Sequence, residues 1–327
     1  MTADKSESKS AKPPRINPFL IPKREHMPKA ALCPWRWADH TEFYVEVDNY
    51  ADSLEIFDAS FADPALLQEN SRLVLVAGDS GCGKSALINH CVHLLAERLP
   101  SPLRAVPVDL TREVEDESGH EMVIDIPKRM SFIGDKLVKK LAAKNLIGEP
   151  VLGTLQGLGD RPHELHAELA NALDSKENFD VVLLLLLPTM ELVQEVEKYA
   201  ALSGRRVVYF AESLLVRSQA EGLANSRGAE VPPVIMTVGT LNPGDVGKFV
   251  DARFEEARTR GDFPGLADEL IEEFENGREM SIARLQQTLA RIYMLAMKKG
   301  EKYASNWTIS LREAQELLFH DTLEGNE

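Results

Sequence analysis

Short apolar runs recur along the chain and are separated by longer stretches with apolar residues at helical spacing. Five runs have the length of a strand, at residues 73–77, 105–110, 181–187, 206–211 and 234–238. Between them, apolar residues return with the period of a helix. Strands that alternate with helices in this way predict an α/β fold with a doubly wound, parallel, five-stranded sheet.

Two of these strands carry further information about their surroundings. Val181–Leu187 is an unbroken apolar run that ends at Pro188, which is typical of a strand buried on both faces. The run at 105–110 contains Pro107, which has no N–H to donate to a neighbouring strand. We therefore expect the strand at 105–110 to lie at an edge of the sheet.

The two ends of the chain differ from this alternating middle. Residues 1–35 hold six of the 18 prolines together with Ser and Lys and show no sustained period, which predicts a flexible basic arm. After Gly239 the pattern is purely helical, and Asn242-Pro243 makes a good helix start. The predicted organisation is an arm at 1–35, an α/β domain at 36–240 and a helical lid at 241–327.

The sharpest motif is Gly-Asp-Ser-Gly-Cys-Gly-Lys-Ser at Gly78–Ser85, which fits G-x-x-x-x-G-K-[ST]. It follows a predicted strand and opens a predicted helix, as a phosphate-binding P-loop requires. The glycines let successive backbone N–H groups point at one phosphate, and the positive end of the helix is directed at the same anion. We expect Lys84 to bridge the β- and γ-phosphates and Ser85 to ligate Mg²⁺. The predicted nucleotide-binding residues are Gly78, Asp79, Ser80, Gly81, Cys82, Gly83, Lys84, Ser85 and Ala86.

The identity of the nucleotide's base, adenine or guanine, is predicted from motifs elsewhere in the sequence. The sequence has no Asn-Lys-x-Asp segment of the kind that reads guanine. An Asp-x-x-Gly at Asp262–Gly265 lies between predicted lid helices rather than after a strand. ATP is therefore preferred to GTP.

ATP hydrolysis in such a site needs an acid opposite the phosphates, at the carboxyl ends of the strands. The strand at 181–187 ends in Pro188-Thr189, where an Asp-Glu pair would be expected. Asp180 lies at the other end of that strand, and Glu191 lies within the following helix. No acid therefore stands at the usual place.

The strand at 206–211 offers a substitute because it is followed by Glu212-Ser213. If this strand lies beside the P-loop strand, Glu212 could orient a water or the metal shell, and Ser213 could contact the γ-phosphate. The alternative is that Glu212 only caps a helix. Asp109 also ends a strand, but a predicted edge strand, so a functional role is less favoured there.

With these residues placed, the chain resembles the additional-strand P-loop ATPases, in particular the AAA+ and STAND-like groups, over about residues 40–320. In that pattern Gly78–Ser85 corresponds to the Walker A loop and Pro188-Thr189 to a degenerate Walker B end. Glu212-Ser213 falls at the sensor-1 position, and residues 242–298 form the helical lid.

The resemblance also implies arginines near the γ-phosphate. Within the lid, Arg284 is the first choice and Arg278 the second, although either could be an exposed helix residue. Arg217 and Arg227 lie between the fourth and fifth strands, where an arginine finger that acts on a neighbouring subunit would be sought. The alternative for both is an ordinary loop cation.

Composition limits the remaining functions. The formal net charge is −15, which disfavours nonspecific nucleic-acid binding, although residues 1–30 hold seven Lys and Arg against three Asp and Glu. No apolar run is long enough to span a bilayer and the N-terminus has no apolar signal core, so we expect a cytoplasmic protein. Three cysteines do not make a disulfide framework. His90 and His93 do not indicate a metal site, and Cys82 could make the loop sensitive to oxidation or alkylation.

Three functions remain open. The first is an ATP-binding conformational switch for a protein partner, with slow or absent hydrolysis. The second is an oligomeric AAA+ ATPase that assembles on DNA or on a protein complex and uses Glu212 as its catalytic acid. The third is a small-molecule kinase, for which the sequence offers no dedicated acceptor site.

Overall fold

The computed structural model describes residues 13–27, 30–113, 125–173, 180–202, 204–215, 219, 222, 231–277, 279–300 and 302–324. The chain divides into two compact units. The sheet unit consists of Ala31–Thr41 and Asp48–Thr240, and the helical unit consists of Met1–Ala30, Glu42–Val47 and Leu241–Glu327. Each unit is described by itself below.

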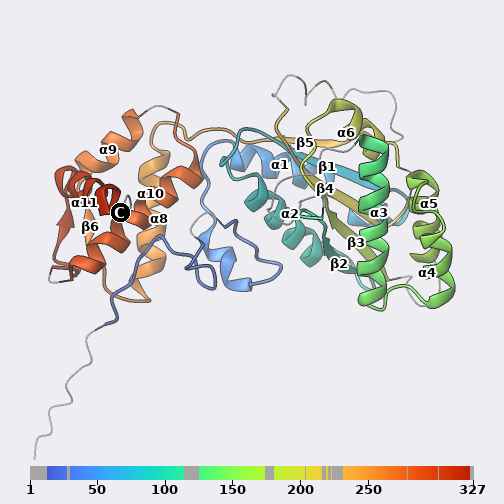
Figure 1. Ribbon diagram of the computed structural model, residues 1–327, viewed down its shortest axis with the longest axis horizontal. Coiled ribbons are helices and arrows are strands. Elements are labelled where there is room, and N and C mark those ends of the chain that lie inside the picture. Colours follow the sequence, from blue (N-terminus) through green and yellow to red (C-terminus); the bar gives the residue numbers. More distant parts are fainter. Residues whose placement is uncertain are drawn as a thin grey trace, which may run out of the picture. The chain divides into compact units, whose positions relative to one another are not determined.

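The sheet unit is built on five parallel strands, which confirms the predicted fold class (Figure 1). They are β1 (Arg72–Ala77), β2 (Arg104–Asp109), β3 (Val181–Leu186), β4 (Val207–Ser213) and β5 (Val234–Thr237). The strand order is β2-β3-β4-β1-β5. The strand with Pro107 therefore lies at an edge, as predicted, and β4 lies directly beside the P-loop strand β1.

Helices cover both faces of this sheet, and the alternation of side chains along each strand decides which cluster a residue joins. Leu73 and Leu75 of β1 belong to the cluster formed with α3 (Ile126–Ala143), α4 (Glu149–Gln156), α5 (Pro162–Leu173) and α6 (Val193–Ala200). Val74 and Val76 belong to the opposite cluster, with α1 (Tyr50–Ser60) and α2 (Lys84–Arg98). The short 3-10 helices are η1 (Ala38–Phe43) and η2 (Pro64–Gln68).

The strand β3 is the most deeply buried element of the sheet. All six of its residues are buried, and they alternate between the two clusters. Removing one such aliphatic side chain from water contributes about 1.5–3 kcal/mol. This explains why an unbroken apolar run, rather than an alternating one, forms this strand.

The helical unit contains α8 (Asp245–Arg258), α9 (Asp268–Asn276), α10 (Ile282–Lys299) and α11 (Leu311–Glu324). Two short parallel strands, β6 (Gly265–Leu266) and β7 (Thr308–Ile309), join it. The helix α8 begins at Asp245 with Gly244 as its N-cap, so the predicted start at Asn242-Pro243 lies just before the helix. The Asp245 carboxylate accepts a hydrogen bond from the Asn242 N–H at 2.8 Å. The helix α11 and the β6–β7 pair were not predicted from the sequence.

Residues 13–27, which belong to the predicted flexible arm, pack against the helical unit. Phe19 is fully buried in the helical unit, with its ring centroid 5.2 Å from that of Tyr293. The side-chain amide of Asn17 donates to the carbonyl of Ala290 at 2.7 Å, and the Ile16 N–H donates to the carbonyl of Asp262 at 3.1 Å. Residues 13–27 are thus part of the helical unit, because the apolar residues around Phe19 gain a core there.

Residues 31–41, by contrast, belong to the sheet unit. The indole N–H of Trp35 donates to Asn89 of α2 at 2.8 Å, and the Asn89 amide donates to the carbonyl of Leu32 at 2.8 Å. The predicted boundary at 240 therefore falls where the two units divide, between Thr240 and Leu241, whereas the predicted boundary at 35 does not: the sheet unit already includes Ala31–Thr41, and Glu42–Val47 belongs to the helical unit. Among the described residues, no helix has the length and apolar character that crossing a lipid bilayer requires.

Candidate functional site

The candidate site begins where β1 ends. Gly78, Gly81 and Gly83 have φ angles of 149°, 81° and 91°, which residues with a side chain rarely adopt. A Cβ atom on Gly78 would lie 2.1 Å from the carbonyl oxygen of Val238, so the close approach of β5's end leaves room for glycine alone. The helix α2 then starts at Lys84. The turn at 78–83 and the first turn of α2 therefore place the predicted nucleotide-binding residues, Gly78 to Ala86, together at the carboxyl edge of the sheet.

This turn leads from the end of β1 directly into the amino end of α2. The first N–H groups of a helix have no partner within the helix and carry a partial positive charge. The helix α2 has 15 residues, and their aligned peptide dipoles together produce this partial charge at its amino end. Such an arrangement suits a phosphate.

The ammonium group of Lys84 lies inside the loop. Its side chain is 5% exposed, and Nζ donates to the carbonyls of Gly78 at 2.8 Å and Asp79 at 2.7 Å. Burial lowers the pKa of Lys84, and the nearby carboxylate of Glu212 opposes that shift. A phosphate would compete with the two carbonyls for the same ammonium group.

Ser85 and Glu212 meet directly. The Ser85 hydroxyl donates to Glu212 Oε1 at 2.5 Å. The contact follows from the sheet order, because β4 pairs with β1 and Glu212 is in register with Val76 just before the loop. A hydroxyl and a carboxylate are the oxygen donors that Mg²⁺ prefers, so these two residues fit the metal that accompanies a nucleotide.

Ser213 does not fit the expectation that it contacts the γ-phosphate. It is fully buried, and its hydroxyl donates to the carbonyl of Met190 at 2.7 Å. The same oxygen accepts a hydrogen bond from the N–H of Leu215 at 3.1 Å. The side chain holds neighbouring backbone rather than facing the loop.

The end of β3 carries no carboxylate that faces the loop among the described residues. Glu191 is exposed, and Asp180 pairs with Arg104 at 2.8 Å at the opposite end of the strand. Asp109, at the end of the edge strand β2, pairs with Arg36 at 2.6 Å and accepts a hydrogen bond from the Thr111 N–H. These contacts give Asp109 a structural role.

Two charged residues at this edge were missed by sequence reasoning. Arg129 of α3 donates to the carbonyl of Thr189 at 2.5 Å, and its Nε lies 3.2 Å from Glu195 Oε1 of α6. Both residues are buried. A signal was available in the sequence, since Arg129 stands beside Met130 at the start of an amphipathic helix, but its partners could not be identified from spacing.

Of the four predicted arginines, Arg284 lies among the described residues. Arg284 is exposed in the first turn of α10, and its N–H is 3.4 Å from the Ser281 hydroxyl that caps the helix. Its contact with a phosphate stays a prediction. Arg278, Arg217 and Arg227 lie outside the described residues.

The cysteine and histidines near the loop have ordinary structural environments. Cys82 is 6% exposed and burial raises the pKa of its thiol, which disfavours the reactive thiolate and the predicted sensitivity to oxidation. His90 Nδ1 contacts the hydroxyl of Tyr50, and His93 lies 3.4 Å from Glu97. In the described parts of the chain, no group of three His, Cys, Asp or Glu residues could hold a metal ion.

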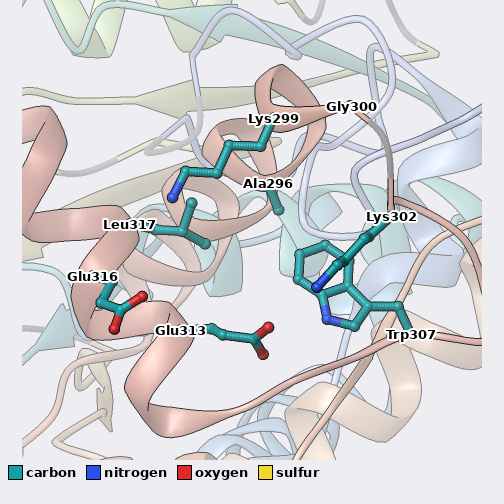
Figure 2. A pocket seen from close by; sticks show the side chains of 8 residues that line it. All are labelled: Ala296, Lys299, Gly300, Lys302, Trp307, Glu313, Glu316 and Leu317. Carbon is teal, nitrogen blue, oxygen red and sulfur yellow. The ribbon is translucent and has the colours of Figure 1, made fainter.

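The helical unit has a separate pocket of about 260 Å³ (Figure 2). It is lined by Ala296, Lys299, Gly300, Lys302, Trp307, Glu313, Glu316 and Leu317. Glu313 already accepts hydrogen bonds from the N–H and hydroxyl of Ser310, each at 3.0 Å, as the cap of α11. The two carboxylates offset the two lysines, so this pocket is a poor match for a phosphate.

Comparison with solved structures gives several likenesses at low sequence identity. The ORC2 protein of Aeropyrum pernix in ADPNP–ADP complexes is 11% identical with a TM-score of 0.54, over 84% of this chain and 67% of that chain. The ORC1 protein of Aeropyrum pernix in complex with DNA is 12% identical with a TM-score of 0.52, over 85% and 67%. Cdc6p from Pyrobaculum aerophilum is 12% identical with a TM-score of 0.50, over 81% and 67%. No protein-family model and no curated protein sequence matches the chain.

At these identities the likeness lies in the fold. A parallel five-stranded sheet followed by a C-terminal helical region is the fold that this chain shares with these structures. The chain therefore shares the fold of these proteins.

Proposed function

We propose that this protein binds ATP with Mg²⁺ at the loop Gly78–Ala86 and acts as a nucleotide-dependent conformational switch for a protein partner. The observation that carries the proposal is the direct contact between Ser85 and Glu212 beside an intact phosphate loop. The fold supports it, and the ORC2 structure with a similar fold is described in ADPNP–ADP complexes. The lack of a guanine-reading Asn-Lys-x-Asp segment favours ATP.

The residues of the loop would act on ATP through charge and hydrogen bonding. Lys84 would exchange the carbonyls of Gly78 and Asp79 for phosphate oxygens. Ser85 and Glu212 would hold Mg²⁺, which supplies charge neutralisation at the β- and γ-phosphates when bound. The amino end of α2 would bind the same phosphates through its free N–H groups.

Slow or absent hydrolysis follows from the end of β3. Activation of the attacking water needs a base near the γ-phosphate, and β3 is followed by Pro188-Thr189, which offers no carboxylate. Glu212 could serve, but its carboxylate is engaged by Ser85. A carboxylate that ligates the metal is a poor base for activating water, so ATP would be hydrolysed slowly. The ATP-bound conformation would then last long enough for a protein partner to bind it.

A second candidate is an oligomeric ATPase that assembles on DNA or on a protein complex. The fold is shared with the ORC1 protein of Aeropyrum pernix, whose structure is described in complex with DNA. In this alternative Glu212 is the catalytic acid, and Arg284 or an arginine of a neighbouring subunit completes the site. We also propose that the switch is of the STAND-like type and that the ATPase of the second candidate is a homo-oligomer. Both candidates imply a protein of the cytoplasm.

The test measures ATP binding by calorimetry and phosphate release on the same sample, with and without Mg²⁺. We expect wild type to bind Mg-ATP with little turnover and Lys84→Ala to lose binding by roughly 100-fold, since it removes a buried, charge-assisted contact. Lys144→Ala, an exposed lysine of the same unit, is the matched control and should bind as wild type does. Steady turnover that disappears in Glu212→Gln would favour the ATPase, and absence of binding in wild type would overturn both proposals.

A further inference from the structure

The turn that follows β3 is held by a buried ion pair. The Arg129 Nε and the Glu195 Oε1 atoms are 3.2 Å apart, and the two side chains are 11% and 3% exposed. Burying two charges costs more free energy than the pair commonly returns, so such a pair is weak evidence for stability alone. Its placement therefore points to a positional role.

Arg129 also binds the backbone of the turn itself. Its Nη2 donates to the carbonyl of Thr189 at 2.5 Å. Thr189 is the residue that stands where this class of site would have its acid. Arg129 thus fixes the backbone at the very point where the usual carboxylate is missing.

The next residue of the turn holds the end of β4. The N–H of Met190 donates to the carbonyl of Glu212 at 2.8 Å, and its carbonyl accepts the Ser213 hydroxyl at 2.7 Å. The regular ladder between β3 and β4 stops earlier, at the pair of Leu186 with Phe210. Beyond it, the Leu187 N–H still donates to the carbonyl of Phe210, and Met190 then provides the contact with Glu212 from this side.

A continuous set of contacts therefore runs from α3 to the phosphate loop. It passes from Arg129 to the carbonyl of Thr189, from Met190 to the backbone of Glu212, and from the Glu212 carboxylate to Ser85. On its other side β4 is fixed by β1, through the register of Glu212 with Val76. If the turn shifted, the Glu212 backbone would lose its hydrogen bond on the β3 side, and the direction of its carboxylate would change.

We propose that Arg129 and Glu195 are positioning residues that hold Glu212 against Ser85 and thereby set the affinity of the site for Mg²⁺. This inference rests on the proposed binding of Mg-ATP. It explains how a site without an acid after β3 keeps one carboxylate at a fixed place. It also predicts an effect confined to the metal, because the contacts that carry the argument lead from Arg129 through Thr189 and Met190 to Glu212.

The test separates metal affinity from nucleotide affinity. ATP binding is measured by calorimetry in excess EDTA and in saturating Mg²⁺, and Mn²⁺ is titrated into the ATP-bound protein as a paramagnetic probe. The main variant is the double substitution Arg129→Met with Glu195→Leu, which removes both charges and keeps the volume, so that no unpaired charge is left in the core. Arg129→Lys is the second variant, because it keeps the charge but loses the planar fork that reaches both partners.

We expect both variants to bind Mn²⁺ roughly 10-fold more weakly, the usual effect of losing a group that orients a metal ligand, with ATP binding in EDTA unchanged. Val138→Ala, a buried truncation on α3 away from the turn, is the control for a general loss of stability and should leave Mn²⁺ affinity as in wild type. Wild-type metal affinity in Arg129→Lys and in the folded double variant would overturn the inference, as would equal weakening of ATP binding in EDTA. If wild type bound no ATP at all, the proposed function itself would fail.

Discussion

At the scale of single residues, the phosphate loop is specified by backbone conformation as much as by its charged groups. Lys84 and Ser85 supply the chemistry, but the loop can curl only where glycine permits it. Gly78 is the most constrained, with a φ of 149° and the Val238 carbonyl oxygen 2.1 Å from the place of a Cβ. The backbone of β5's end cannot yield as a flexible side chain would.

We therefore expect Gly78→Ala to lower the free energy of unfolding by on the order of 3 kcal/mol, from backbone strain together with the contact at Val238. Chemical denaturation monitored by circular dichroism measures the change. Gly153→Ala in α4 is the control, because nothing lies within 4 Å of its Cβ position and alanine favours a helix. Equal stability of Gly78→Ala and wild type would show that the loop does not have this conformation.

At the scale of elements, the contact of α5 with β4 contains a buried polar pair. His166 of α5 is 5% exposed, and its Nδ1 lies 2.8 Å from the hydroxyl of Tyr209 of β4. Burial lowers the pKa of His166 to about 4. The imidazole is therefore neutral in the folded protein over a range of pH in which an unfolded histidine takes up a proton.

The sign of the pH effect follows from this difference. Between about pH 6.5 and pH 4 the unfolded chain binds more protons than the folded chain, so stability falls as the pH falls, by up to roughly 3 kcal/mol for one such group. His90, whose pKa burial also lowers to about 4, acts in the same direction. We expect His166→Phe to have a distinctly smaller fall in unfolding free energy between pH 7 and pH 4.5 than wild type, measured by urea denaturation at each pH. The exposed His320→Asn should keep the wild-type slope, and an unchanged slope in His166→Phe would mean that the imidazole is solvated.

At the scale of the whole molecule, the sequence was sufficient where a local pattern decides the structure. The apolar run that forms β3, Pro107 in the edge strand and the glycines of the phosphate loop are read from neighbouring residues alone. The ion pair of Arg129 with Glu195 could not be predicted, because its partners are 66 residues apart and meet only through packing. The position of the Ser213 side chain could not be predicted either, because its hydroxyl donates to the carbonyl of Met190 in another segment of the chain.

The placement of residues 13–27 is the largest difference from the sequence-based organisation. A proline-rich, basic composition favours an extended arm. A single aromatic residue outweighs this tendency, because Phe19 is surrounded by the rings of Phe249, Phe254 and Tyr293. These partners lie more than 200 residues along the chain, so no local pattern could reveal them.

This placement predicts that Phe19 stabilises the helical unit. Phe19→Ala should cost about 3–5 kcal/mol of unfolding free energy through lost burial and the cavity left behind. Because the chain forms two compact units, scanning calorimetry can resolve whether they unfold separately. We expect the substitution to lower the transition of the helical unit and to leave that of the sheet unit in place, with Met27→Ala, at a 38% exposed position in the same segment, close to wild type. A thermogram unchanged by Phe19→Ala would mean that the segment is not part of the helical core, whereas an equal shift of every transition would mean that the two units unfold as one.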